Sequence, residues 1–191
     1  MTDPLASGTP LVIAAHGTRD KSGVAECRAL AERIAGKLPG IPVELGFVEL
    51  AEPGIPEAVR AAVAQAPKKP EEADGDEEPA AAVVVPLMFN TGGHVREDIP
   101  EAIDEGRGDA RVVYSAPLLP DVRMRKALSR RLSETLAAGE GREEWRSRDT
   151  AVVLVGRGAL VPDANASHYT LTRMFWDCLL YTSPSPRDLS T

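Results

Sequence analysis

Short apolar runs alternate along this chain with longer stretches in which apolar residues recur every three or four positions. The apolar runs, which predict strands, are residues 10–15, 42–50, 81–89 and 111–118. The periodic stretches, which predict helices, are residues 23–38, 55–66, 94–107 and 120–138. A short apolar run between turn residues is typical of a buried strand, and a period near 3.6 is typical of an amphipathic helix. The pattern therefore predicts four successive strand–helix units.

Strand–helix units joined by short connections favour one fold class. Parallel strands need a crossover connection, which is usually a helix that packs on the sheet. We therefore predict an α/β fold, a flavodoxin-like doubly wound parallel sheet, in a first domain over residues 1–138. Within it, residues 67–80 are charged, rich in proline and without apolar periodicity. This composition predicts a disordered acidic loop on the surface.

The pattern begins again after a polar linker at residues 139–149. The stretch "VVLVGRGALVPDANASHYTL" at 152–171 aligns with "LVIAAHGTRDKSGVAECRAL" at 11–30, at a constant offset of 141 residues. Self-similarity of this kind is typical of repeated domains. We predict that residues 150–177 form the first β-α unit of a truncated second domain that repeats the first.

The repeat keeps the turn of the first domain but loses one polar side chain. The alignment pairs Gly17 with Gly158, whereas it pairs His16 with Arg157. A residue that only the fold requires would be expected in both copies. The difference indicates that His16 serves more than the fold.

The end of the chain has a different character. The stretch "CLLYTSPSPRD" at 178–188 resembles the translation of a transposase adapter used in preparing DNA sequencing libraries. We therefore predict that residues 178–191 are a non-native tail outside the fold. Cys27 is then the only native cysteine, and with Cys178 it offers neither a disulfide framework nor metal-ligand spacing.

Charge and composition limit the classes of partner. The net charge is −7, and residues 71–78 contribute six negative charges with no positive ones, so the rest is nearly neutral. A nucleic-acid-binding surface would need a basic stripe, which the sequence lacks. There is also no apolar run long enough to span a bilayer and no leader-like amino terminus. We expect no nucleic acid or membrane partner and a cytoplasmic location.

Three polar side chains follow the ends of predicted strands. His16 follows the first strand, Glu49 ends the second, and His94 follows the third after a glycine pair. The carboxyl ends of parallel strands lie along one edge of the sheet, where open α/β sheets bind ligands. Two imidazoles and a carboxylate suit a first-row divalent ion with open coordination positions. They suit proton abstraction near neutral pH equally well.

Each of these residues also has a purely structural interpretation. His16 can cap a strand, Glu49 can be a surface carboxylate, and His94 can lie at the positive end of a helix. The coincidence of all three at one sheet edge favours a site. Gly92 and Gly93 would let a flat ligand approach closely, because glycine has no side chain, but they also suit an ordinary turn.

Three short motifs then give the chain a family resemblance. In order they are "AAHGTR", "FVELAEP" and "PLMFNTGGHVREDIP", and they fall within residues 10–138. In this order and spacing the chain resembles the class II chelatases of tetrapyrrole metabolism, the sirohydrochlorin chelatases and their cobalt-inserting relatives. The stretch "VGRGALVPDANA" resembles the opening of the second half of two-domain members.

The resemblance implies a lyase that inserts Fe²⁺ or Co²⁺ into sirohydrochlorin, in sirohaem or cobalamin biosynthesis. It makes His16, Glu49 and His94 both the metal ligands and the catalytic residues, with no cofactor beyond the substrate metal ion. The ring carries many carboxylates and therefore needs nearby cations and space. The residues expected to bind it are Arg19, Lys21, Gly92, Gly93 and Arg96.

Two other functions fit parts of the pattern. Histidine phosphatases and phosphomutases also place His-Gly at a strand end, but their pattern resembles Arg-His-Gly, whereas Ala15 precedes His16 here. A non-catalytic metal or tetrapyrrole carrier would need the same three ligands, and turnover separates it from an enzyme. The native metal and the oligomeric state stay open at the level of sequence.

Overall fold

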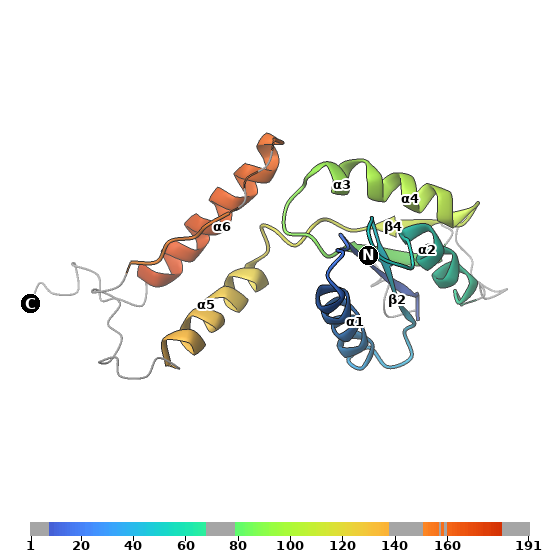
Figure 1. Ribbon diagram of the computed structural model, residues 1–191, viewed down its shortest axis with the longest axis horizontal. Coiled ribbons are helices and arrows are strands. Elements are labelled where there is room, and N and C mark those ends of the chain that lie inside the picture. The colour runs from blue at the N-terminus through green and yellow to red at the C-terminus, as the bar shows by residue number, and fades with distance from the viewer. Residues whose placement is uncertain (1–7, 68–78, 138–150, 157, 159, 181–191) are drawn as a thin grey trace, which may run out of the picture. The chain divides into compact units, whose positions relative to one another are not determined.

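The computed structural model describes residues 8–67, 79–137, 151–156, 158 and 160–180. The chain divides into two compact units, Met1–Pro117 and Leu118–Thr191. Figure 1 draws both units and labels most of their helices and strands. Nearly all of the predicted acidic loop, the whole predicted linker and most of the predicted tail lie outside the described residues.

Four short strands form the sheet of the first unit. They are β1 (Leu11–Ala15), β2 (Val43–Phe47), β3 (Ala82–Pro86) and β4 (Val112–Tyr114). Their order is β2-β1-β3-β4, and every pairing is parallel. The predicted parallel sheet is confirmed. Each strand is shorter than the apolar run that predicted it.

Helices connect these strands. They are α1 (Lys21–Ala35), α2 (Ile55–Ala64), α3 (Gly93–Arg96) and α4 (Asp98–Arg107). α1 begins where Asp20 caps it, with the carboxylate accepting a hydrogen bond of 3.0 Å from the Ser22 backbone N–H. The helix predicted over 94–107 is two helices, because Glu97 leaves helical geometry at φ −124° and ψ −69°.

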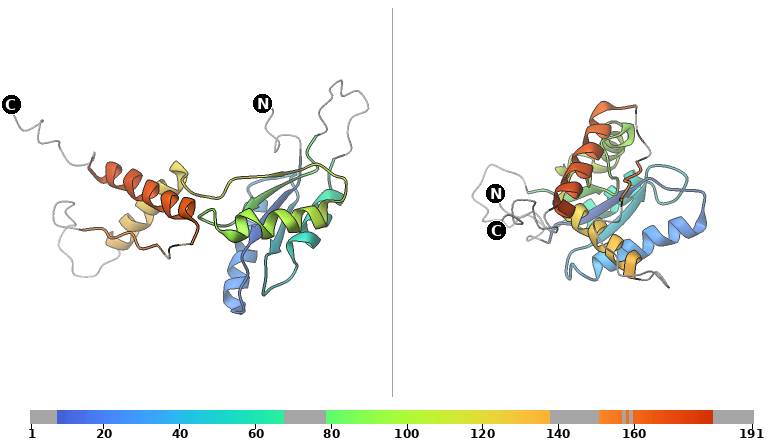
Figure 2. Two further views of the ribbon diagram at one scale, coloured as in Figure 1. Left: turned by 90° about the horizontal axis from the view of Figure 1, so that it is seen from above. Right: turned by 90° about the vertical axis from the view of Figure 1, so that its left-hand side faces the viewer.

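Helices cover both faces of the sheet, as the doubly wound prediction requires (Figures 1 and 2). On one face Val12 and Ala14 of β1 belong to a core cluster with residues of α2 and α4. On the other face Leu11 and Ile13 pack with Ala31 of α1. Since successive side chains of a strand point to opposite faces, β1 is buried from both sides. The apolar run of β1 thus fixes the centre of the sheet.

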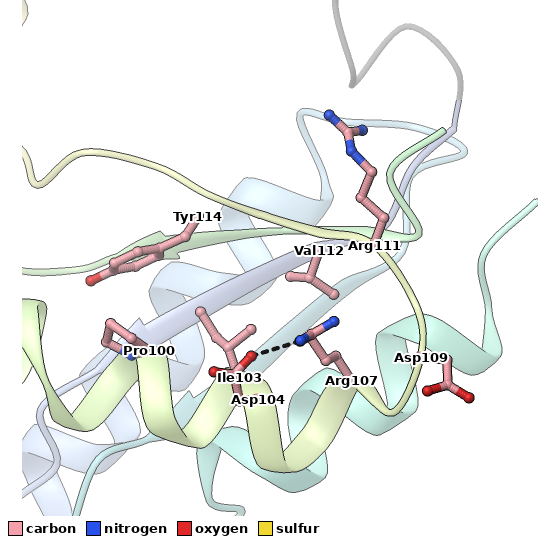
Figure 3. A pocket seen from close by; sticks show the side chains of 8 residues that line it. All are labelled: Pro100, Ile103, Asp104, Arg107, Asp109, Arg111, Val112 and Tyr114. Atoms are coloured by element: carbon pink, nitrogen blue, oxygen red, sulfur yellow. Dashed lines mark hydrogen bonds and ion pairs between the residues drawn. The ribbon is translucent and has the colours of Figure 1, made fainter. Parts of the chain in front are cut away.

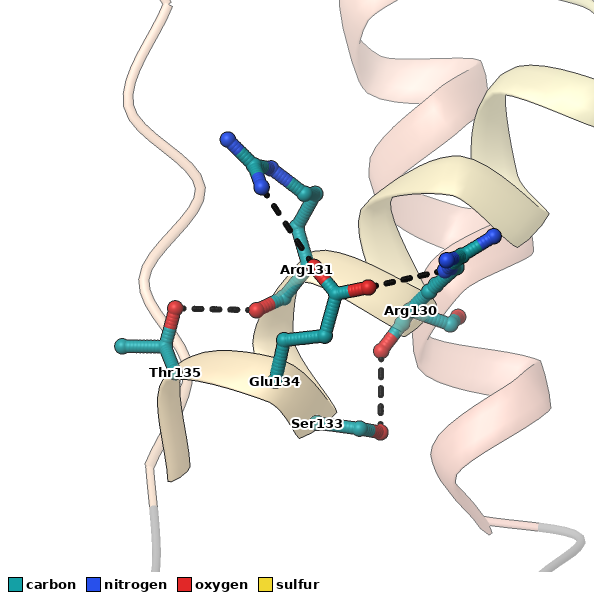
Figure 4. A network of polar contacts seen from close by, with 6 residues as sticks. Arg130, Arg131, Ser133, Glu134 and Thr135 are labelled. Carbon is teal, nitrogen blue, oxygen red and sulfur yellow. Dashed lines mark hydrogen bonds and ion pairs between the residues drawn. The ribbon is translucent and has the colours of Figure 1, made fainter. Parts of the chain in front are cut away.

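The second unit contains α5 (Val122–Ala137) and α6 (Pro162–Leu180). α5 carries its own polar network on adjacent turns (Figure 4). Arg130 Nε donates to Glu134 Oε1 at 2.8 Å, and Arg131 Nη1 donates to Glu134 Oε2 at 3.3 Å. Both hydrogen bonds lower the pKa of Glu134, and the bond from Arg130 has the larger effect. The described helices include none that is long and apolar enough to cross a membrane.

Two features of the second unit stand at positions that the sequence alignment pairs with features of the first unit. α6 begins at Pro162, which lies 141 residues after the first residue of α1. Gly158 has a positive φ of 72°, as Gly17 has at 91°. α6 also extends through Cys178, into the first residues of the predicted tail.

The strand predicted at the start of this repeat is wrong. Residues 151–156 are irregular backbone, and Val153 and Val155 are 81% and 87% exposed. A strand needs a neighbouring strand for its backbone hydrogen bonds. β1 has β2 and β3 beside it, whereas no strand of the described residues pairs with 151–156.

Candidate metal and tetrapyrrole site

The ladder between β1 and β2 continues beyond both strands and brings two candidate ligands together. The backbone N–H of Val48 donates to the carbonyl of Ala15 at 2.9 Å, and that of Glu49 donates to the carbonyl of His16 at 3.1 Å. These bonds hold the two strand exits side by side. His16 and Glu49 therefore project from adjacent, hydrogen-bonded backbone.

His94 reaches the same place from α3. The next residue, Val95, is buried at 5% exposure and anchors this short helix in the core. The Tyr114 hydroxyl on β4 donates to the Val95 carbonyl at 2.9 Å. Burial raises the pKa of Tyr114 to about 12, so the phenol stays a neutral donor even above its ordinary pKa of about 10. α3 is thereby fixed to the end of β4.

The three side chains converge. His16, Glu49 and His94 each offer a ligand atom, and these atoms lie within 4.8 Å of one another. His16 Nδ1 is 3.9 Å from Glu49 Oε1. The two imidazole rings meet edge to face, with centroids 4.6 Å apart and an interplanar angle of 86°. The predicted meeting of these residues at one sheet edge is confirmed.

The cluster is open to an incoming ligand. The side chains of His16 and Glu49 are each 49% exposed, and that of His94 is 37% exposed. Residues that only supported the core would be buried among apolar neighbours. An exposed trio of two imidazoles and a carboxylate can hold a divalent ion and leave further positions free for other ligands.

One polar partner in this cluster has no role in the predictions made from sequence. Asp98 Oδ2 is hydrogen-bonded to His94 Nδ1, across the break between α3 and α4. The signal was present in the motif "HVRED", because residues four apart share a helix face. The spacing alone does not predict a role for Asp98, because it does not show that His94 belongs to a site.

The residues predicted to bind the tetrapyrrole lie on the two segments that carry the histidines. Arg19 and Lys21 are exposed, at the end of the β1–α1 loop and at the first residue of α1. Gly92 caps α3 and Gly93 begins it, and a Cβ on either would meet no atom within 4 Å. Arg96 is exposed at the last residue of α3.

A separate pocket of about 420 Å³ lies between α4 and β4 (Figure 3). Its charged lining includes Asp104 and Arg107, which pair with each other at 2.7 Å. None of the three candidate ligands lines it. The cluster of His16, Glu49 and His94 thus lies at the edge of the sheet and not in this pocket.

Comparison with protein families gives a match over the first strand–helix units and α5. The CbiX family model matches residues 10–135. The matched range contains all three clustered side chains and both helices of the α3–α4 segment.

Individual proteins that are similar to this chain are named sirohydrochlorin chelatases. The sirohydrochlorin cobaltochelatase of Priestia megaterium is 32% identical over 140 residues, which cover 72% of this chain and 40% of that protein. The sirohydrochlorin cobaltochelatase of Sulfolobus acidocaldarius is 31% identical over 127 residues, covering 66% of this chain and 92% of that protein.

A solved structure is similar over most of the chain. It is the crystal structure of the sirohydrochlorin chelatase SirB from Bacillus subtilis subspecies spizizenii in complex with cobalt, with a TM-score of 0.67 and 25% identity. The match covers 88% of this chain and 62% of that one. The chain spans about half the length of its Priestia megaterium and Bacillus subtilis relatives, which are named cobaltochelatase or ferrochelatase.

Proposed function

The chain belongs to the CbiX family, and from this premise we propose that it is a lyase that inserts Fe²⁺ or Co²⁺ into sirohydrochlorin. The observation that carries the proposal is the convergence of His16, Glu49 and His94, whose ligand atoms lie within 4.8 Å of one another. Relatives named for this reaction supply the substrate class. No other cofactor is part of the proposal.

The reaction sets two demands that this cluster can meet. Inserting a divalent ion into the ring releases two pyrrole N–H protons and strips water from the ion. A neutral imidazole can accept a proton or bind a metal near pH 7, and a carboxylate oxygen can stay with the ion while water leaves. Because the cluster supplies no more than three protein ligands, coordination positions of the ion stay open for the ring nitrogens. His16, Glu49 and His94 are therefore proposed as ligands and catalytic residues together.

The ring itself needs a surface that receives it. Arg19 and Lys21, which follow His16, supply positive charge for peripheral carboxylates of the ring. Arg96 does the same beside His94. The open space at Gly92 and Gly93 gives the flat ring room next to His94. We assign these five residues to substrate binding.

The proposed site is contained in residues 1–138. The Sulfolobus acidocaldarius relative supports this assignment, because the matched 127 residues make up 92% of that protein. We propose that residues 150–177 begin a second chelatase-like domain after a linker at 139–149. The positive φ of Gly158 and the start of α6 support this repeat. We keep the proposal that residues 178–191 are a non-native tail.

The native metal is proposed as iron or cobalt because relatives carry both names. Ligand chemistry alone does not separate the two ions, since nitrogen and oxygen ligands accept both. In the cell, supply and site geometry decide between them. Comparing the rates with Fe²⁺ and Co²⁺ on one preparation assigns the preference.

Metal insertion by the purified full-length chain tests the function. The chain is mixed with sirohydrochlorin in large excess and with Fe²⁺ or Co²⁺, and the absorbance change of the ring is followed against the uncatalysed rate. Many turnovers per chain are expected. A non-catalytic carrier, the second candidate, would bind metal or ring in stoichiometric amount and would leave the rate of metallation unchanged. That result would overturn the proposed enzyme.

A further inference from the structure

The two histidines of the cluster are held in different ways. His94 Nδ1 is hydrogen-bonded to a carboxylate, that of Asp98. His16 Nδ1 lies 3.2 Å from the carbonyl oxygen of Gly17 and 3.9 Å from Glu49 Oε1. Only His94 among the three candidate ligands therefore has an acidic partner, within the described residues, that is not itself a candidate ligand.

We propose that Asp98 is a positioning residue for His94. By accepting a hydrogen bond from Nδ1–H, the carboxylate selects the tautomer in which Nε2 carries the free electron pair. The same bond fixes the rotation of the ring. A metal-ligating histidine commonly gives its second N–H to such a partner, which orients it and makes it a stronger ligand. This inference rests on the proposed function, in which His94 binds the metal.

The chain geometry around Glu97 explains how Asp98 reaches His94. The break at Glu97 ends α3 and starts α4, so Asp98 is the first residue of a ten-residue helix. A negative side chain is favoured in the first turn of a helix, because the unpaired backbone N–H groups there carry partial positive charge. The position of Asp98 in the first turn of α4 therefore favours its negative charge beside His94.

Buried residues alternate with exposed ones along α3 and the start of α4, and they hold the backbone of His94 and Asp98 in place. Val95 and Ile99 are buried at 5% and 0% exposure, and both lie one residue beyond His94 and Asp98. Each buried residue holds its turn against the core and leaves the polar residue before it at the surface. The Tyr114 hydroxyl adds a bond to the Val95 carbonyl. The backbone that presents His94 and Asp98 is therefore rigid, and their hydrogen bond then orients the ring.

The arrangement predicts that the ligand geometry of His94 exists before metal arrives. Asp98 is 50% exposed on its side chain, so substituting it removes no core contact. Three variants separate orientation from folding. Asp98→Ala removes the acceptor, and Asp98→Asn keeps an amide oxygen that can accept from Nδ1–H. Glu101→Gln is the matched control, since Glu101 is an exposed acid in the same first turn of α4.

The first test reads the tautomer of His94 in the metal-free full-length chain. Two-dimensional ¹H–¹⁵N NMR of the imidazoles distinguishes the two tautomers, and His94→Ala assigns the signals. We expect His94 to be protonated at Nδ1 in the wild type, in Asp98→Asn and in Glu101→Gln. Asp98→Ala should lose this single tautomer. An unchanged His94 spectrum in Asp98→Ala would overturn the proposal, whatever the chain catalyses.

The second test measures binding of Co²⁺ alone, through its visible absorption. Loss of such a partner typically lowers metal affinity about 10–100-fold, so Asp98→Ala should bind Co²⁺ that much more weakly. Asp98→Asn should regain most of the affinity, and Glu101→Gln should match the wild type. Equal melting temperatures for the three variants would exclude a general structural effect. Equal Co²⁺ affinity in Asp98→Ala and Glu101→Gln would overturn the positioning role, whereas absent chelatase turnover in the wild type would overturn only the proposed function.

Discussion

Gly17 lies directly against the carbonyl oxygen of Glu49: a Cβ built on Gly17 would stand 1.8 Å from it. Gly17 also has a φ of 91°, in the region that side chains disfavour. The chain turns out of β1 at this point and passes the end of β2 at contact distance. The residue after His16 is therefore a glycine for two independent reasons, and the close approach also involves the backbone of Glu49.

Gly17→Ala should damage folding and the site together. The new Cβ must displace the Glu49 backbone, and overpacking of this kind costs about 1–3 kcal/mol. The positive φ adds about 1–2 kcal/mol. We expect a lower free energy of unfolding in urea titrations, together with weaker Co²⁺ binding because the Glu49 carboxylate moves.

Gly40→Ala is the matched control for this change. Gly40 has a similar φ of 83°, but its Cβ would meet no atom within 4 Å. Gly40→Ala should therefore show the conformational cost alone and bind Co²⁺ normally. Equal destabilisation by the two substitutions would show that the contact with Glu49 has no energetic weight.

His16→Ala and His94→Ala should each lower the chelatase rate by at least about 100-fold, the scale of a lost acid–base or ligand group. Because both side chains are substantially exposed, the free energy of unfolding should change by less than about 1 kcal/mol. Steady-state rates and urea titrations on the same preparations check both parts.

His168→Ala provides the comparison, since His168 lies on α6 in the second unit. It should retain the wild-type rate. If His16→Ala unfolds the chain while His94→Ala keeps full activity, the two histidines do not act as one site.

Tyr114→Phe should destabilise the first unit by about 1 kcal/mol, the typical net value of one hydrogen bond. The bond from Tyr114 to the Val95 carbonyl exists only while the phenol is protonated. The folded pKa of about 12 exceeds the ordinary value of about 10. Its stabilising effect is therefore complete below pH 10 and is lost as the pH rises towards 12.

Urea titrations at pH 8 and pH 11 test this assignment. The wild type should lose more stability between these two values than Tyr114→Phe does. A phenylalanine keeps the ring packing and removes only the hydroxyl, so packing changes do not enter. Identical pH dependence in the two proteins would contradict the role of this hydroxyl.

Leu50 follows Glu49 in a strained conformation, with a φ of 64° and 49% of its surface exposed. Leu50→Gly should raise the free energy of unfolding, because a left-handed conformation costs a residue with a Cβ about 1–2 kcal/mol and glycine almost nothing. Leu50→Ala keeps the strain and removes most of the side chain. A gain in Leu50→Ala equal to that in Leu50→Gly would trace the effect to the exposed side chain instead.

Much of the site was predictable because topology alone brings its residues together. His16, Glu49 and His94 each follow a strand, and parallel strands end at a common edge. The spacing in sequence is irrelevant once the strands are recognised. The same reasoning yielded the parallel sheet, since a helical stretch follows each apolar run.

The rest depends on contacts that no local pattern encodes. The role of Asp98 needs the break at Glu97, and the contact between Gly17 and Glu49 needs the register of β1 against β2. The strand expected at residues 152–155 failed for a related reason. An apolar run indicates that a segment favours the extended conformation of a strand. A strand also needs a second strand beside it to pair with its backbone.

That exposed run leads to the last prediction. Residues 151–156, "AVVLVG", are apolar, rich in β-branched valine and uncharged. Such windows promote aggregation when they are exposed, and a charge within the window suppresses it. We expect the double variant Val153→Glu and Val155→Glu to stay monodisperse in light scattering at protein concentrations where the wild type aggregates. Its rate of metal insertion should be unchanged, because the three candidate ligands belong to the first unit.

Charge alone also improves solubility, so the control must add the same charge elsewhere. Thr135→Glu with Thr170→Glu does so at exposed positions on α5 and α6. If the exposed valines cause association, this control should aggregate nearly as the wild type does, because its apolar window is intact. Equal improvement in both double variants would assign the effect to net charge. A lower insertion rate in the valine variant alone would instead show that residues 151–156 contribute to the site.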